Sequence, residues 1–199
     1  MSARKNTADH CSTNIKMTTM KSAFSHHIQH LFLATLILLF CVPAIAQTEA
    51  NGKCVKKKSV FSMSYTVTTN INATPEKLWS LLTNAGTLPQ WNTTVNSIDG
   101  TIAEGEKIAL VAAIAPERTF KLSIRNVEPN KQMKWKDGAM PMFRGVRTYT
   151  LTAKPDGTTD FTMTEKFKGL MFPMIKGVLP DFTQSFEDYA RDLKLEAEK

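Results

Sequence analysis

The residues best suited to chemistry are Arg147 and Glu165, which lie on either side of a predicted β-hairpin turn. Residues 154–158, Lys-Pro-Asp-Gly-Thr, have the composition of a three-residue hairpin loop with Gly157 in the left-handed conformation. If the residues flanking this loop pair, Arg147 lies opposite Glu165 on one face of a sheet. Arginine stays protonated and its charge stabilises a neighbouring carboxylate, so this pair favours binding a ligand oxygen over acid–base catalysis.

The same hairpin register predicts what surrounds the pair. It places Tyr149 opposite Met163 and Leu151 opposite Phe161, so the apolar residues share a face that should point inward. One interpretation of an inward Arg–Glu pair is a structural ion pair, which costs about 3–5 kcal/mol to break. The other is a polar anchor in an apolar cavity, where Arg147 binds a carboxylate or enolate oxygen of a ligand. Both interpretations remain open from the sequence.

A pair that faces inward needs a covering element, and residues 181–197 supply a candidate. Apolar residues recur there at helical spacing, which predicts a long helix with one aromatic-rich face: Phe182, Phe186, Tyr189, Leu193 and Ala197. Asp181 is the predicted N-cap. Such a helix must lie on an apolar surface.

The segments upstream of this helix have the patterns of strands. Residues 60–71 alternate apolar and polar side chains, as expected for a strand with one buried face. Two short helices should follow, at 74–84 with Thr74 as N-cap and at 88–92. Further strands are predicted at 95–102, 107–115, 118–127, 131–137, 143–154 and 158–170. No helical periodicity interrupts this series, so we expect an α+β domain at 59–199 with an antiparallel sheet of about six to seven strands.

The first 46 residues have the features of a secretory signal peptide. A charge-free apolar run at 31–42 follows Lys16 and Lys21 and precedes Ala-Ile-Ala at 44–46, a small-residue cleavage signal. A bilayer-spanning helix needs ~20 apolar residues, and this run is shorter. We therefore expect cleavage after Ala46 and export to the periplasm or the medium, with an uncleaved anchor as the alternative. Residues 47–58 are expected to form a polar linker.

Removal of this leader restricts the available chemistry. All 4 histidines precede residue 47, and only Cys54 of the 3 cysteines follows it. The mature chain then has no histidine nucleophile system or zinc site and no internal disulfide, and it shows no cofactor motif. The leader holds four of the 25 basic and one of the 18 acidic residues, which leaves 21 and 17 and a net charge of +4. The lysines at 56–58 are interpreted as a solvated linker, because no aromatic residues are interleaved for a nucleic-acid contact.

The order of these elements, with the residues at their junctions, resembles the START-like helix-grip superfamily, in particular its polyketide cyclase/dehydrase-type (SRPBCC) branch. The matching segments are Ile71-x-Ala73-x-Pro75-Glu76-Lys77-Leu78-Trp79, Leu88-Pro89-x-Trp91-Asn92, Met133-x-Trp135, Gly145-x-Arg147-x-Tyr149-x-Leu151 and Glu165-x-Phe167-x-Gly169-Leu170. The resemblance implies a curved sheet that grips the C-terminal helix around an apolar cavity. Members bind lipids, sterols or polyketides, and some are cyclases or dehydratases. Many relatives carry histidine where this chain has Arg147, so the resemblance does not extend to histidine-based chemistry.

We therefore expect an exported protein that binds a hydrophobic small molecule between sheet and helix, without a catalytic residue, metal or cofactor. The expected ligand contacts are Arg147, Glu165, Tyr149, Phe143, Phe167, Met142, Trp135, Tyr65, Phe182 and Phe186. The alternative is a small cofactor-independent cyclase or dehydratase acting on a polyketide-like substrate through Arg147, Glu165, Tyr149 or Tyr65. The methionine-bearing segments 138–143 and 169–174 are either a cavity mouth or part of the core. A nucleic-acid partner and a membrane span after cleavage are not expected, and the sequence does not indicate an oligomeric state.

Overall fold

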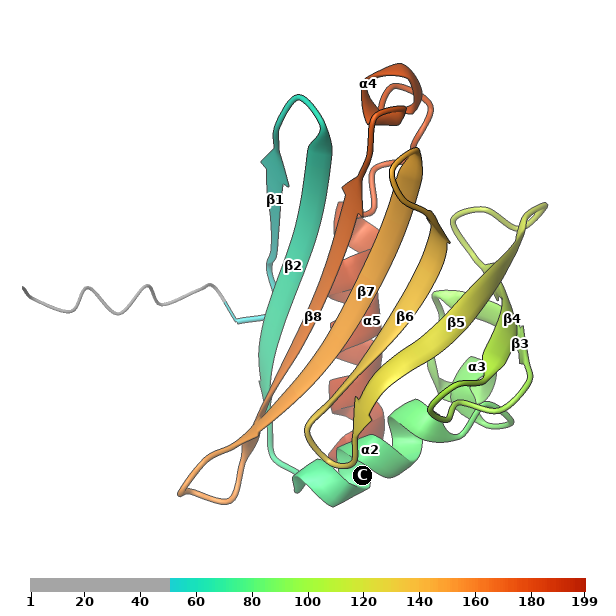
Figure 1. Ribbon diagram of the computed structural model, residues 1–199. Helices are drawn as coiled ribbons and strands as arrows, with labels where there is room; N and C mark the ends of the chain where they lie inside the picture. Colours follow the sequence, from blue (N-terminus) through green and yellow to red (C-terminus); the bar gives the residue numbers. More distant parts are fainter. Residues whose placement is uncertain (1–50) are drawn as a thin grey trace, which may run out of the picture. The chain divides into compact units, whose positions relative to one another are not determined.

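The computed structural model describes residues 51–199, which form one antiparallel eight-stranded sheet and a long C-terminal helix (Figure 1). The strands are β1 (Cys54–Lys58), β2 (Ser62–Ile71), β3 (Val95–Asp99), β4 (Lys107–Ala112), β5 (Thr119–Glu128), β6 (Gln132–Ala139), β7 (Phe143–Ala153) and β8 (Thr159–Lys168). The helices are α2 (Pro75–Thr83), α3 (Leu88–Trp91), α4 (Phe172–Ile175) and α5 (Thr183–Ala197). The predicted α+β class is confirmed. The predicted signal peptide and its cleavage site lie outside the described residues.

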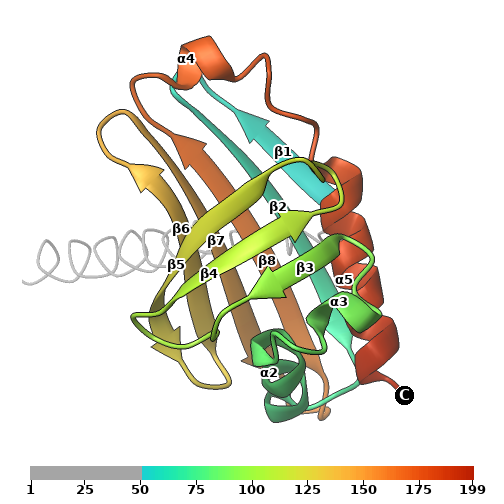
Figure 2. The same cartoon turned by 90° about the vertical axis from the view of Figure 1, so that its right-hand side faces the viewer.

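The second strand and the last strand of the chain are neighbours in the sheet. The order across the sheet is β1-β2-β8-β7-β6-β5-β4-β3, so β2 pairs with β8 although most of the domain separates them in sequence. The two short helices carry the chain from β2 to the far edge of the sheet at β3. Figure 2 shows that the sheet is curved, with β3, β4 and β5 turned toward the side that α5 covers. Thr48–Lys199 forms a compact unit with its own hydrophobic core.

The prediction of a polar linker over residues 47–58 was wrong for its second half. Cys54–Lys58 is strand β1, which pairs antiparallel with β2 and raises the number of strands to eight. Its register joins Cys54 to Val67 and Lys58 to Met63. The sequence of this segment shows no alternation of apolar and polar side chains, because a strand at the edge of a sheet does not need one. Its lysines suit an edge, since charged edge strands resist pairing with another chain.

The predicted register of the last hairpin is confirmed. The Lys154 N–H donates to the Thr158 carbonyl at 2.8 Å, and Gly157 has a φ of 83°, in the left-handed region. Arg147 is consequently paired with Glu165 in the β7–β8 ladder. Burial alternates along β8, with Phe161 and Met163 inside the core, so the apolar face of the hairpin does point inward.

Helix α5 lies along the concave side of the sheet and packs mainly on β2 and β1, with further contacts to α2, α3 and β8. It begins at Thr183, two residues later than predicted, because the Asp181 carboxylate accepts the Thr183 N–H and hydroxyl and forms a turn before the helix. The expected stripe is buried: Phe182, Phe186, Tyr189, Leu193 and Ala197 are each at most 8% exposed.

Candidate ligand-binding site

The centre of the concave face is occupied by an ion pair between β7 and β8. The Arg147 Nε and Nη2 atoms both donate to Glu165 Oε2, at 2.8 Å and 2.6 Å. The side chains keep 19% and 14% of their surfaces accessible, respectively. The pair is therefore only partly buried, and a small polar group can reach it. The third guanidinium nitrogen, Nη1, makes no hydrogen bond to Glu165, and Tyr149 is a second partner of the guanidinium.

Aromatic side chains enclose the guanidinium. The Arg147 Cζ lies 5.2 Å from the centre of the Phe186 ring, which α5 contributes from above. Trp135 is the cross-strand partner of Arg147 on β6, and its ring centre lies 5.0 Å from that of Tyr149. A cation over an aromatic face is attracted by the ring's quadrupole, so these contacts hold the guanidinium in place as well as shielding it.

Three polar atoms in this environment are fully buried: Tyr149 Oη, Tyr189 Oη and Trp135 Nε1. Trp135 Nε1 has no hydrogen-bond partner, whereas Tyr149 interacts with both Arg147 and Tyr189. The rings of Tyr149 and Tyr189 lie 5.9 Å apart, which brings groups from β7 and α5 together. Buried donors without acceptors are rare and costly in folded proteins. All three can donate, and Arg147 adds a fourth donor. The cluster thus matches a molecule or molecular end that carries oxygen acceptors.

The electrostatics keep these groups in their donor forms. Burial acts to lower the pKa of Arg147, but the Glu165 carboxylate and Tyr149 more than offset it, so the pKa is raised and the side chain stays charged. Burial raises the pKa of Tyr149, although the Arg147 charge works in the opposite direction. Burial likewise raises the pKa of Tyr189 well above its usual value. Both tyrosines therefore remain protonated and able to donate at neutral pH.

The remaining predicted contacts extend from this centre toward one end of the sheet. Phe143 and Phe167 stack with ring centres 6.1 Å apart, and Phe182 lies 5.6 Å from Phe167. Tyr65 packs edge-on against Phe182 at 5.6 Å. These rings contact one another directly, so this part of the interface between sheet and helix is packed aromatic core. Met142, the last predicted contact, is 50% exposed and lies beyond these rings.

The methionines of the segments 138–143 and 169–174 do not lie in the hydrophobic core. The interpretation of these segments as core is therefore wrong for the methionine side chains. Met140, Met171 and Met174 are 44%, 36% and 78% exposed. Within the second segment only Phe172 is fully buried, at 1%. The short helix α4, which the sequence did not predict, turns Phe172 inward and the methionine at 174 outward.

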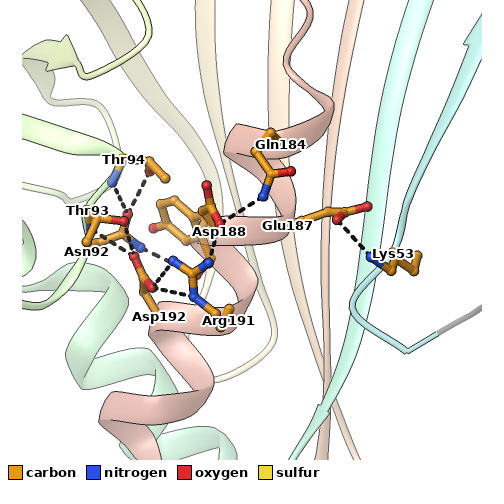
Figure 3. Close-up of polar contacts among 10 residues, drawn as sticks. Lys53, Asn92, Thr93, Thr94, Gln184, Glu187, Asp188, Arg191 and Asp192 are labelled. Carbon is orange, nitrogen blue, oxygen red and sulfur yellow. Dashed lines mark hydrogen bonds and ion pairs between the residues drawn. The ribbon is translucent and has the colours of Figure 1, made fainter.

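A buried carboxylate that the sequence did not indicate fixes α5 over the site. Asp192 is 6% exposed, and its Oδ2 accepts the Thr93 N–H at 2.9 Å and the Thr93 hydroxyl at 2.5 Å. Arg191 pairs with its other oxygen at 2.8 Å (Figure 3). Asn92 Oδ1 accepts from Thr94, and Asn92 Nδ2 donates to the Tyr189 carbonyl at 3.4 Å. The sequence could have indicated this burial, because Asp192 lies three residues after Tyr189 and directly before Leu193, which both belong to the buried face of α5.

The opposite side of α5 is tied to β1. Glu187 Oε1 accepts the Cys54 N–H at 3.0 Å, and its Oε2 pairs with Lys53 at 3.2 Å, as Figure 3 shows for the lysine. Lys56 pairs with Asp181 at 2.8 Å, and this contact lowers the pKa of the Asp181 carboxyl. These contacts explain why a polar segment joins the sheet: its backbone and lysines find acceptors on the helix.

An open groove of about 680 Å³ lies at the other end of the sheet and is not part of this cluster. It is lined by the start of α2, by residues 128–132 and by residues 150–153 of β7. Neither Arg147 nor Glu165 contributes to it. None of the residues that line the groove has a buried polar side-chain atom without a hydrogen-bond partner. The groove and the Arg147 cluster are therefore separate features of the domain.

Among residues 51–199, no group of three or more His, Cys, Asp and Glu side chains could hold a metal ion. No helix in the same range is long and apolar enough to cross a membrane.

A curved antiparallel sheet closed around a C-terminal helix, with two short helices inserted after an early strand, defines a START-like helix-grip protein. Residues 62–196 match the family described as polyketide cyclase / dehydrase and lipid transport, and the chain belongs to that family. The resemblance inferred from the junction segments is thereby confirmed.

Solved structures agree on the fold. The chain is similar to the di-domain ARO/CYC protein BexL from the BE-7585A biosynthetic pathway, with a TM-score of 0.57 and 13% identity over 71% of this chain and 52% of that one. A conserved protein of unknown function from Enterococcus faecalis gives a TM-score of 0.53 and 16% identity, covering 74% and 78% of the two chains. A START superfamily protein from Mycobacterium smegmatis gives a TM-score of 0.51 and 16% identity, covering 68% of this chain and 97% of that one. At these identities the similarity establishes the fold alone. No curated protein has a sequence that matches this chain.

Proposed function

We propose that this protein binds a hydrophobic small molecule and holds its oxygen-bearing end against Arg147. The observation that carries the proposal is the buried polar cluster of Arg147, Tyr149, Tyr189 and Trp135 under α5, in which the Trp135 Nε1–H has no protein acceptor. The family's description, polyketide cyclase / dehydrase and lipid transport, supports a ligand of this chemical class.

The arrangement favours binding over turnover. Glu165 already occupies two donors of Arg147, which leaves Nη1 as the edge of the guanidinium that is not bonded to Glu165. Charge-assisted hydrogen bonds to a carboxylate or enolate oxygen are stronger than neutral ones, so a ligand with such an end gains most from this position. The aromatic surroundings restrict the access of water and match an apolar ligand body.

A second candidate is a cofactor-independent cyclase or dehydratase. It is favoured by the closeness of the protonated Tyr149 to Arg147, because two donors on one ketone oxygen would stabilise an enolate. The two candidates differ in what happens to the bound molecule. A carrier releases it with unchanged mass, whereas a dehydratase releases it after loss of water.

The proposal includes export, with cleavage after Ala46, because the apolar run at 31–42 and the small residues that follow have the pattern of a signal peptide. N-terminal sequencing of the protein from its native host should begin at Gln47. A first residue within the leader would contradict cleavage at this position.

The binding test uses cis-parinaric acid, a fluorescent long-chain carboxylic acid, and its methyl ester as matched probes. Arg147→Met combined with Glu165→Leu removes the polar pair and leaves an apolar site. We expect this double variant to lose about tenfold or more in affinity for the acid and much less for the ester. Thr148→Val, on the neighbouring position of β7 whose side chain faces the opposite side of the sheet, is the control and should bind both probes as the parent does.

Native mass spectrometry after gentle purification supplies an independent readout. A co-purifying hydrophobic molecule of constant mass supports the carrier. An equal affinity of the parent and the double variant for the acid removes Arg147 from the proposal. Failure of the parent to bind either probe, or any lipid in a thermal-shift series, refutes the binding function.

A further inference from the structure

Exposed apolar side chains gather at one end of the molecule. Eight of the ten large hydrophobic residues exposed within 51–199 belong to three neighbouring turns, and we call them the apolar rim: Val60, Phe61, Met140, Met142, Leu170, Met171, Met174 and Val178. Met174 and Val178 are the most exposed, at 78% and 82%. Single exposed apolar residues are ordinary on protein surfaces, but a contiguous group of this size indicates an interaction site.

Backbone hydrogen bonds join these turns. The Gly169 N–H donates to the Phe61 carbonyl at 3.3 Å, which connects the β1–β2 turn to the end of β8. The Leu170 N–H donates to the Pro141 carbonyl at 3.0 Å and the Met171 N–H to the Met142 carbonyl at 2.9 Å. Figures 1 and 2 both show the β1–β2 turn, the β6–β7 turn and α4 at the same end of the sheet.

The close approach of these turns depends on a glycine. Gly169 has a φ of 144°, and a Cβ built on it would lie 2.2 Å from the Met142 carbonyl oxygen. Any other residue would push the two turns apart. The turns are therefore fixed to one another, and the apolar rim is a defined surface, not a set of independent loops.

The three segments that carry the apolar rim hold charge of one sign, although Asp137, Glu165 and Asp181 directly adjoin them. Segments 57–63, 138–144 and 166–180, which contain the whole rim, hold six basic residues and no acidic one. The basic residues are Lys57, Lys58, Arg144, Lys166, Lys168 and Lys176. All five of the lysines are exposed. The remainder of 47–199 holds 15 basic and 17 acidic residues, so the positive excess of the domain is located at this end.

We propose that the apolar rim docks on an anionic lipid bilayer. Methionine, leucine, valine and phenylalanine side chains partition into the boundary between headgroups and acyl chains, and flanking lysines are attracted to anionic headgroups. This combination fits an anionic bilayer better than a protein partner with an acidic face, because flexible methionines and a short helix suit a fluid surface without fixed shape.

Docking at this end also places the stacked Phe143 and Phe167 next to the bilayer, since both residues lie in the segments that form the rim. A hydrophobic molecule could then pass between the membrane and the cluster at Arg147 without crossing water, provided that the packed rings of Phe143, Phe167 and Phe182 move apart. This consequence rests on the proposed ligand-binding function, whereas docking itself is a property of the surface and is tested without any ligand.

The test measures sedimentation of residues 48–199 with vesicles. This unit has its own core and lacks the apolar leader, which would otherwise bind membranes itself. The probes are phosphatidylcholine vesicles with and without about a quarter of phosphatidylglycerol. We expect binding to the anionic vesicles that weakens by about tenfold or more between about 0.05 M and 0.5 M salt.

Met174→Asp combined with Val178→Asp should reduce binding to the anionic vesicles by at least about tenfold. Leu195→Asp is the matched control, because Leu195 is 61% exposed but lies on α5 outside the rim, and it should bind within about twofold of the parent. Lys168→Glu combined with Lys176→Glu should reduce binding and remove most of its salt dependence. Equal unfolding temperatures of all variants exclude misfolding as the cause.

Three results would overturn the proposal. They are absence of vesicle binding by the parent, equal binding to neutral and anionic vesicles, and equal losses for Leu195→Asp and the rim variant. None of them bears on cis-parinaric acid binding, so docking and ligand binding fail separately.

Discussion

Replacing Arg147 with methionine should destabilise the domain by about 2–3 kcal/mol. The change removes both donors to Glu165 Oε2, which accepts from Arg147 at 2.8 Å and 2.6 Å, and it leaves a carboxylate against aromatic rings. Removing one partner of a fully buried pair costs about 3–5 kcal/mol. Glu165 keeps 14% of its side chain accessible, so water recovers part of this free energy, and we place the loss just below that range.

Removing both charges should restore most of the stability. Arg147→Met with Glu165→Leu replaces the pair by apolar side chains of similar volume, which is often neutral or stabilising in protein interiors. We expect the double variant to lie within about 1 kcal/mol of the parent, and each single variant to lose about 2–3 kcal/mol. The coupling free energy of the double-mutant cycle is then at least about 3 kcal/mol.

Urea unfolding of residues 48–199, followed by tryptophan fluorescence and circular dichroism, measures all four free energies. Thr148→Val serves as the control on the opposite face of β7 and should change the free energy by less than about 0.5 kcal/mol. Additive losses in the double variant, or a loss below about 0.5 kcal/mol for Arg147→Met, would refute the buried-pair reasoning.

Three further outcomes follow from the geometry. Asp192→Ala should cost about 2–4 kcal/mol in urea unfolding, because Thr93 and its backbone N–H lose a buried charged acceptor, while Asp188→Ala on the exposed side should cost less than about 1 kcal/mol. Gly169→Ala should lower the unfolding temperature by several degrees, since φ is 144° and a Cβ would meet a carbonyl oxygen at 2.2 Å; an unchanged temperature would contradict the fixed rim. Tyr149 and Tyr189 have raised pKa values in the folded state, so their stabilisation is complete below the unfolded pKa of about 10 and is lost as pH rises through the folded values. Ultraviolet titration should show Tyr149 and Tyr189 ionising only with unfolding, and their ionisation in the folded domain would contradict their burial.

The sequence determined those features that depend on neighbours along the chain. The loop at 154–158 set the β7–β8 register, because a short hairpin loop with a left-handed glycine permits one pairing. That register correctly placed Arg147 opposite Glu165. The apolar spacing in α5 likewise predicted which face is buried, since helical periodicity alone orients a side chain. Five short segments in the correct order also identified the family.

Only the tertiary structure decided which distant segments meet. Strand β1 exists because the edge of β2 and the carboxylate of Glu187 accept it, and neither is visible in the local sequence Cys54–Lys58. Asp192 is buried because Thr93, far away along the chain, supplies its hydrogen bonds. The apolar rim arises from three turns that contact one another only after the sheet has formed. Periodicity encodes the direction of a side chain, whereas its partners depend on long-range packing, which no short stretch of sequence contains.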